Sequence, residues 1–176
     1  MTHHDHVPPG ASALVLTASD RSAAGLREDA SGEAIAERLA TLGLTVERQI
    51  VADDRPAIEA ALREGAAWHR LIVTTGGTGL TPRDVTPQAT RAVIDYEVPG
   101  LAEAMRAAGR MKTPLADLSR SLVGVARGSL VVNLPGSPTA AIESLDAIMA
   151  AIPHALETLA GPFDHEARRG AEEAGG

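Results

Sequence analysis

The segment TTGGTGLTPRDVTP, residues 74–87, joins two different patterns along the chain. Before it, residues 71–73 (LIV) are a short run of branched apolar side chains, which is typical of a buried strand. After it, residues 88–94 (QATRAVI) have the pattern of a helix. Glycines let a backbone approach a ligand closely, and free N–H groups ahead of a helix start favour an anion. The segment therefore predicts a loop that binds a phosphorylated ligand at the carboxyl end of a parallel strand.

The same segment departs from two common phosphate-binding motifs. It lacks the Lys-Ser/Thr ending of a nucleoside-triphosphate P-loop, and it lacks the G-x-G-x-x-G spacing of a dinucleotide fold. It also places Arg83 next to Asp84, which we expect to form a buried pair. The simplest templates are excluded, but a phosphate-binding loop is not.

Strand and helix patterns alternate on the N-terminal side of this loop. Residues 13–18, 44–51 and 71–74 have strand patterns. Helices are expected at 31–42, with Ser31 as N-cap, and at 57–67, with Asp54 as N-cap and Pro56 in the first turn. This alternation predicts a parallel sheet that is covered by helices on both faces.

On the C-terminal side, the chain adds a hairpin and a second glycine-containing junction. Arg127-Gly128 separates two apolar runs, 122–126 and 129–134, which predicts a hairpin and hence one antiparallel strand. Residues 133–138 (NLPGSP) then lead into a helix that starts at Ser137 or Thr139 and is expected to continue through Leu156. The fold class is therefore α/β, with a mostly parallel sheet and helices on both faces.

Composition narrows the classes of function. Aromatic residues make up only 2% of the 176 residues, so the core must consist of Ala, Val, Leu and Ile. The net charge of -7 argues against a nucleic-acid partner, which requires a positive surface. The absence of cysteine excludes disulfides, thiolate metal sites and thiol catalysis. No apolar run approaches the roughly 18 residues of a membrane span, and no signal-peptide pattern is present, so we expect a cytoplasmic protein without a membrane partner.

The ends of the chain are expected to be disordered. Residues 1–12 are polar and contain Pro8-Pro9-Gly10, and residues 161–176 are rich in glycine and glutamate. This leaves one domain at 13–160. The run His3-His4-Asp5-His6 is interpreted as a solvated tail rather than a metal site, because nothing around it builds a second shell.

Two carboxylates are the main candidates for catalysis. Asp53 and Asp84 follow successive strands, and the carboxyl ends of parallel strands share one edge of a sheet, so we expect these groups to converge. Paired carboxylates beside a phosphate loop suit Mg²⁺. The arrangement predicts nucleotidyl or phosphoryl transfer, in which positioning and charge neutralisation dominate.

Other candidates have both a structural and a functional interpretation. Ser19 and Asp20 follow the first strand and form either a ligand rim or an exposed connection with local turn bonds. Ser119 and Arg120 are candidates to hold a phosphate or a heterocycle edge, although for Arg120 alone a structural role is favoured. The loop at 135–137 offers backbone groups to a polar ligand.

Four segments together resemble the molybdopterin-binding domain of molybdenum-cofactor biosynthesis proteins. They are TTGGTG (74–79), RDVTP (83–87), LSR (118–120) and NLPGSP (133–138). Ser19-Asp20-Arg21 and Asp29-x-Ser31-Gly32 also fit the first loop of that family. The resemblance covers roughly residues 13–160, with no departure at these motifs.

The resemblance implies a three-layer α/β fold, usually assembled as a homotrimer. It implies an adenylyltransferase that joins AMP from Mg-ATP to the phosphate of molybdopterin and releases pyrophosphate. Metal insertion then takes place on another protein, which suggests a hand-over to a molybdate-inserting partner. In the family, the residues that match Asp53 and Asp84 are the key carboxylates, and the serine of the Leu-Ser-Arg motif matches Ser119.

These matches suggest an expected role for each of the site residues. Residues 75–79 cradle phosphates, Asp53 holds Mg²⁺ with or without Asp84, and Asp84 orients the molybdopterin phosphate. Ser119, Arg120 and the 135–138 loop hold the pterin. The full set of expected ligand-binding residues is Ser19, Asp20, Thr75, Gly76, Gly77, Thr78, Gly79, Arg83, Ser119, Arg120, Asn133, Pro135, Gly136, Ser137 and Pro138.

Three alternatives are compatible with parts of this pattern. The chain could be a molybdopterin-binding paralogue or carrier without catalysis, a scaffold protein that reuses the domain, or an unrelated nucleotide-binding enzyme. Retention of both Asp53 and Asp84 favours the enzyme over the carrier.

Overall fold

The computed structural model of the chain describes residues 7–161. The His3-His4-Asp5-His6 run and most of the predicted disordered ends lie outside the described residues. Ala11 is buried, and the first strand begins at Ser12, close to the predicted start of the domain. The domain limits of 13–160 stay a prediction. No helix in the described part of the chain is both long enough and apolar enough to cross a membrane.

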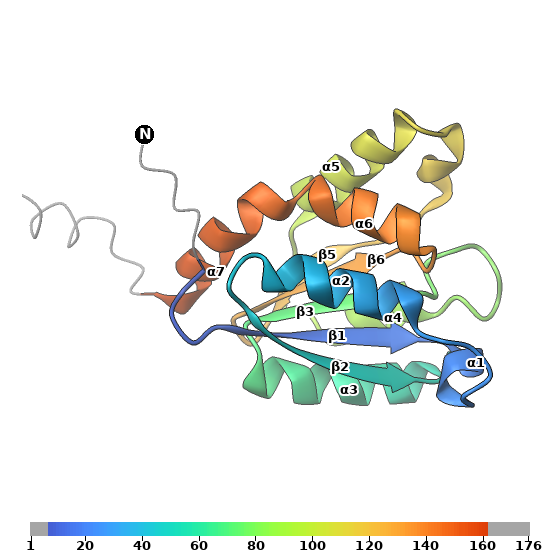
Figure 1. Ribbon diagram of the computed structural model, residues 1–176, viewed down its shortest axis with the longest axis horizontal. Coiled ribbons are helices and arrows are strands. Elements are labelled where there is room, and N and C mark those ends of the chain that lie inside the picture. Colours follow the sequence, from blue (N-terminus) through green and yellow to red (C-terminus); the bar gives the residue numbers. More distant parts are fainter. Residues whose placement is uncertain (1–6, 162–176) are drawn as a thin grey trace, which may run out of the picture.

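Six strands form one sheet (Figure 1). They are β1 (Ser12–Ala18), β2 (Thr45–Val51), β3 (Leu71–Thr75), β4 (Tyr96–Glu97), β5 (Val123–Ala126) and β6 (Ser129–Leu134). The spatial order is β2-β1-β3-β6-β5-β4, and β2, β1, β3 and β6 run parallel. Strand β5 is antiparallel to both of its neighbours. The predicted mostly parallel sheet with one antiparallel strand is therefore confirmed.

The β5–β6 hairpin has the turn that the sequence predicts. Arg127 has φ +52 and Gly128 has φ +78, so both central residues are left-handed. Two such residues suit the twist of a two-residue hairpin, and the pairing of Ala126 with Ser129 closes it.

Helices cover both faces of the sheet. The α-helices are α1 (Asp20–Ala23), α2 (Ala30–Ala40), α3 (Arg55–Trp68), α4 (Thr86–Arg91), α5 (Pro99–Arg110), α6 (Pro138–Asp146) and α7 (Ile152–Ala160). Within residues 7–161 there are also two short 3-10 helices, η1 (Pro114–Leu118) and η2 (Met149–Ala151). In Figure 1, α2, α6 and α7 lie above the strands and α3 lies below them.

Alternating side chains of the strands divide the core into two layers. Val15 of β1 packs in one layer with Ile35 and Leu39 of α2, while its neighbours Leu14 and Leu16 pack in the other layer with α3. Side chains that point alternately to opposite faces make this division automatic in a sheet that is buried on both sides. The three-layer fold is thus built from aliphatic residues, as the composition requires.

Three predicted helix boundaries change. Asp29 rather than Ser31 caps α2, because its Oδ1 accepts from the N–H of Gly32 at 2.9 Å. Helix α4 begins at Thr86, with Pro87 in its first turn.

The predicted long helix up to Leu156 is wrong, because the segment divides into α6, η2 and α7. Pro153 lies in the first turn of α7, where a proline fits but cannot continue a preceding helix. The predicted N-cap at Asp54 is confirmed by a 3.0 Å bond from the N–H of Ala57.

The four parallel strands end at one edge of the sheet. Ala18 pairs with Val51, and Thr75 pairs with both Thr17 and Leu134, so the strand ends are in register. The loops that leave this edge begin at Ser19, Ala52, Gly76 and Pro135. They contain most of the residues that the sequence nominates as a site.

Candidate active site

The loop between β3 and α4 depends on two glycines. Gly76 has φ +95 and Gly77 has φ +65, which favours glycine over residues with a side chain. A Cβ on Gly76 would lie 2.4 Å from the carbonyl oxygen of Ala18, and one on Gly77 would lie 2.4 Å from Oγ1 of Thr86. The loop therefore passes directly over the end of β1 and against the start of α4.

Asp84 is fixed by its own loop. Its Oδ2 accepts from the N–H of Thr81 at 2.8 Å and from the Thr81 hydroxyl at 2.6 Å. Burial acts to raise the pKa of Asp84, but these two bonds, the backbone of Gly79 and the nearby Arg120 outweigh burial and hold that pKa below its ordinary value. Asp84 is therefore an ionised carboxylate with a fixed orientation.

The predicted buried pair of Arg83 and Asp84 is wrong. The side chain of Arg83 is exposed, and its guanidinium pairs with the carboxylate of Asp20 at the end of β1. Because Asp84 turns back onto Thr81, it is not available to its neighbour in sequence. Arg83 thus links the loop to the first strand instead.

Asp20 and Asp53 hold each other through their backbones. The N–H of Asp20 donates to Oδ2 of Asp53 at 3.0 Å, and the N–H of Asp53 donates to Oδ1 of Asp20 at 2.9 Å. The bond from the backbone of Asp53, followed by the bond from Arg83, lowers the pKa of Asp20. This reciprocal pair joins the ends of β1 and β2.

Asp53 is in a less favourable environment for a charge. Burial raises its pKa, and the negative charges of Asp20 and Asp84 raise it further, while the bond from the N–H of Asp20 and the charge of Arg83 only partly compensate. The charge of Asp84 is the weakest of these influences on Asp53, and the convergence of the two carboxylates stays a prediction.

The donor set fits a magnesium ion that arrives with a nucleotide. Among residues 7–161, no three acidic or histidine side chains gather as a ready-made metal site. Mg²⁺ commonly takes only one or two protein carboxylates, with phosphate oxygens and water as its other ligands. A cation beside Asp53 would also relieve the unfavourable charge of that carboxylate, so Asp53, with Asp84 nearby, is the position that suits it.

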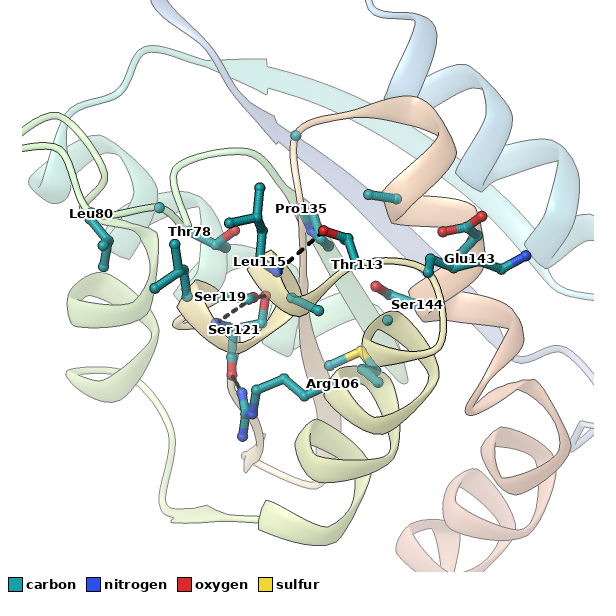
Figure 2. Close-up of a pocket in the computed structure, with 18 of the residues that line it drawn as sticks. Thr78, Leu80, Arg106, Thr113, Leu115, Ser119, Ser121, Pro135, Glu143 and Ser144 are labelled. Carbon is teal, nitrogen blue, oxygen red and sulfur yellow. Dashed lines mark hydrogen bonds between the residues drawn. The ribbon is translucent and has the colours of Figure 1, made fainter.

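A large cavity, of about 630 Å³, opens beside Asp84. This volume is typical of a site for a small molecule. Figure 2 shows Thr78 and Leu80 on one side, Glu143 and Ser144 on the opposite side, and Ser119 between them. Of the predicted site residues, this cavity is lined by Gly77, Thr78, Gly79, Asp84, Ser119, Pro135 and Gly136.

A second cavity, of about 240 Å³, lies at the ends of β1, β3 and β6. Its predicted members are Ser19, Thr75, Gly76, Gly136, Ser137 and Pro138. A Cβ on Gly136 would lie 3.3 Å from Cα of Gly76, so the two loops meet where the cavities adjoin. The Thr75 hydroxyl strengthens this junction by donating to the carbonyl oxygen of Pro135 at 2.8 Å.

Ser19 has features of both roles that the sequence left open, a local turn bond and a place at the rim of a cavity. Its Oγ accepts from the N–H of Ser22 at 3.2 Å, which is a local turn bond, and it also lines the second cavity. Asp20 lines none of the cavities described here, because it is engaged with Asp53 and Arg83.

Arg120 holds the loop in place and does not line the large cavity. Its Nε donates to the carbonyl oxygen of Gly79 at 2.7 Å, and its Nη2 donates to that of Asp84 at 2.5 Å. Its backbone N–H donates to the carbonyl oxygen of Thr78 at 3.0 Å. Three bonds from one residue thus fix the path of the loop that presents Asp84.

Asn133 lies beneath the site rather than in its wall. It is fully buried, and its Nδ2 donates to Oγ1 of Thr74 and Oγ1 of Thr90, each at 2.9 Å. Asn133 therefore ties β6 to β3 and α4 directly under the loop.

Sequence reasoning missed one wall of the large cavity. Residues of α5, η1, α6 and the turn between α5 and η1 supply it, including Arg106, Lys112, Leu115, Glu143 and Ser144. These residues belong to ordinary helical patterns and carry no motif. Only their position in the folded structure shows that they line the cavity.

Comparison with known proteins gives one consistent result. Residues 14–154 match the family described as a probable molybdopterin binding domain. The chain is 42% identical over 154 residues to the molybdopterin adenylyltransferase of Helicobacter pylori, covering 85% of this chain and 88% of that protein. It is 35% identical over 167 residues to the molybdopterin adenylyltransferase of Escherichia coli K12, covering 85% of each.

Comparison with solved structures points to the same family. The fold is similar to the molybdopterin biosynthesis enzyme MoaB of Thermus thermophilus, with a TM-score of 0.80 and 46% identity over 87% of this chain and 99% of that one. It is also similar to the molybdopterin biosynthesis Mog protein of Mycobacterium ulcerans, with a TM-score of 0.81 and 43% identity over 85% of this chain and 99% of that one.

Proposed function

The chain belongs to the molybdopterin-binding domain family, and from this we propose that it transfers an adenylyl group from ATP to the phosphate of molybdopterin. The products are adenylyl-molybdopterin and pyrophosphate, which places the protein in molybdenum-cofactor biosynthesis. The observation that carries the proposal is that two cavities meet at the loops of Gly76 and Gly136, and that the ionised Asp84 lines the larger of them. Two adjoining cavities suit a reaction between two bound substrates.

The reaction requires positioning more than proton transfer. An oxygen of the molybdopterin phosphate forms a bond to the α-phosphorus of ATP, and the bond from that phosphorus to the bridging oxygen breaks, so that pyrophosphate leaves. The attacking oxygen is already ionised near neutral pH, so no general base is needed. Catalysis then depends on bringing two anions together and compensating their charge.

The glycine loop provides the phosphate-binding groups. The backbone amides of Gly77 and Thr78 and the Thr78 hydroxyl bind phosphate oxygens, because the left-handed Gly76 and Gly77 leave these groups without a side chain in the way. The N–H of Gly76 instead donates to the carbonyl oxygen of Leu134. Asp84, fixed by Thr81 and by the clamp of Arg120, orients the acceptor phosphate for in-line attack. Asp53, with or without Asp84, holds Mg²⁺ of the Mg-ATP substrate, which neutralises charge on the phosphate oxygens.

The pterin occupies the larger cavity in this proposal. Ser119 and the 135–138 loop hold its polar edge, and Arg120 contributes by keeping the opposite loop in place. The nucleotide approaches from the side of Ser19 and the ends of β1 and β3. The family resemblance further supports a cytoplasmic homotrimer that passes its product to a separate molybdate-inserting protein.

The decisive experiment is incubation of the protein with molybdopterin and Mg-ATP. We expect stoichiometric release of pyrophosphate and a product whose mass increases by one adenylyl group, with no release when molybdopterin is omitted. Tight molybdopterin binding without pyrophosphate would identify a binding-only paralogue or carrier. Absence of both binding and turnover would overturn the proposal.

A further inference from the structure

A third cavity, of about 300 Å³, lies between α4, α5 and residues 120–123. Pro87 and Arg91 are one turn apart on α4 and supply one wall. Pro99, Ala102 and Arg106 follow one another along one face of α5 and supply the opposite wall. The site described above uses neither Arg91 nor this space.

The charge of this cavity is unusual for the chain. Three arginines line it, namely Arg91, Arg106 and Arg120, and Glu97 is the only carboxylate among its lining residues. Arg91 and Glu97 form an ion pair with a distance of 3.0 Å between Nε and Oε1. The lining of the cavity therefore carries an excess of positive charge, in a protein whose net charge is -7. Asp84, outside this lining, offsets part of the charge of Arg120.

The other two arginines bind neutral oxygens rather than carboxylates. Nη1 of Arg106 donates to the carbonyl oxygen of Ser121 at 2.9 Å, a contact that can be followed in Figure 2. Arg120 donates to the carbonyl oxygens of Gly79 and Asp84. Carbonyl oxygens orient a guanidinium but leave its charge in place. Among residues 7–161, the guanidinium groups of Arg91, Arg106 and Arg120 make no hydrogen bonds beyond these and the pair with Glu97, so each has further N–H donors.

We propose that this cavity binds a small tetrahedral oxyanion of the phosphate class, held by Arg91 and Arg106 and in contact with the outer side of Arg120. Guanidinium groups match such anions because their planar N–H forks pair with two oxygens at once. The volume leaves room for one such ion with part of its hydration. Arg120 would connect the bound anion to the loop that carries Asp84, because the same guanidinium holds both.

This site is separate from adenylyl transfer and does not rest on it. Arg106 and Ser121 line both this cavity and the large cavity, which makes them the boundary between the two. Inorganic phosphate, pyrophosphate and molybdate share the chemistry that the cavity recognises, so the source of the anion is a matter for experiment.

The test is calorimetric titration of the whole protein with sodium phosphate, at constant ionic strength and with Mg-ATP present to fill the phosphate-binding loop. We expect one binding site in the wild type and a loss of affinity of roughly tenfold or more in Arg91→Gln, the scale for losing one charged hydrogen-bond donor. The matched control is Arg38→Gln, which removes another exposed arginine that is paired with a carboxylate, Asp146, and should bind phosphate like the wild type. Adenylyl transfer measured without added anion should be unchanged in Arg91→Gln.

Parallel titrations with pyrophosphate and molybdate identify the anion that the cavity prefers. The side chain of Arg91 is exposed, so the variant should fold, and Arg91→Glu provides a second variant in which phosphate binding should disappear. The proposal is overturned if the wild type shows no saturable binding of any of these anions. Equal affinity in the wild type and both Arg91 variants would overturn it as well.

Discussion

Asp53 and Asp84 leave the same edge of the sheet, from strands that flank β1, but they meet opposite surroundings. Asp84 receives hydrogen bonds from Thr81, and its pKa is lowered. Asp53 receives one bond from the N–H of Asp20, lies near two other carboxylates, and has a raised pKa. One carboxylate is stabilised as an anion by its own loop, and the other is not.

This difference assigns the two groups different tasks. A carboxylate that is already satisfied and rigid can orient a substrate without rearrangement. A carboxylate that is poorly compensated gains most from a cation, so it is the better ligand for Mg²⁺. In the proposed reaction, Asp84 is accordingly the positioning group and Asp53 the metal ligand.

The largest effect is expected for Asp84→Asn. Loss of this charge should lower kcat/KM for adenylyl transfer by about 10²-fold or more, the scale for a fixed electrostatic group. Pyrophosphate release measures the effect, and Asp146→Asn, an exposed carboxylate paired with Arg38, is the matched control. Full activity in Asp84→Asn would remove this residue from the mechanism.

Asp53→Asn should act through the metal. We expect the Mg²⁺ concentration for half-maximal activity to rise by about tenfold or more, because a neutral amide is a weaker ligand than a carboxylate. The same titration on Asp84→Asn should show a smaller change. If the two variants respond equally to Mg²⁺, the assignment of separate tasks is wrong.

A substitution of Arg120 tests whether the fixed position of Asp84 contributes to catalysis. Arg120→Lys keeps the charge but cannot hold the carbonyl oxygens of Gly79 and Asp84 together, so kcat should fall by about tenfold while molybdopterin binding changes little. In the double variant with Asp84→Asn, the two losses should be less than additive. A selective loss of molybdopterin binding would instead make Arg120 a direct ligand.

The smallest effect concerns stability and has opposite signs for the two carboxylates. The raised pKa of Asp53 means that ionising it disfavours the folded state, a cost that appears as pH rises through its folded pKa. The lowered pKa of Asp84 means that its ionised form stabilises the folded state, a contribution that is lost as pH falls through its folded pKa. At pH 7, Asp53→Asn should raise Tm by roughly 1–3 °C and Asp84→Asn should lower it by a similar amount.

Thermal unfolding from pH 7 down to about pH 3 measures both shifts, which should shrink as the carboxylates become protonated. Tm changes of the same sign at pH 7 would contradict the comparison.

Local patterns in the sequence were sufficient for much of the fold. The turn at Arg127-Gly128, the cap at Asp54 and the glycine loop after β3 depend on a few neighbouring residues, so their chemistry is visible in the sequence. The helix break before Pro153 was also a local signal, which the apolar periodicity of that segment concealed.

Partners that are distant in sequence were not accessible in this way. Arg83 pairs with Asp20, which is 63 positions away, rather than with the adjacent Asp84. Arg120 reaches carbonyl oxygens 41 and 36 positions away, and backbone carbonyls carry no sequence signal at all. The walls that α5 and α6 supply to the cavities follow from how these helices cross the sheet.

By itself, therefore, the sequence determined the α/β fold, the shared edge at which Asp53 and Asp84 emerge, and the family to which the chain belongs. Only the tertiary structure decided that the loop of Asp84 stabilises its charge while the surroundings of Asp53 do not, and that three arginines line a common cavity. The physical reason is that periodicity and turn chemistry act over a few residues, whereas burial and charge depend on every segment that packs around a group.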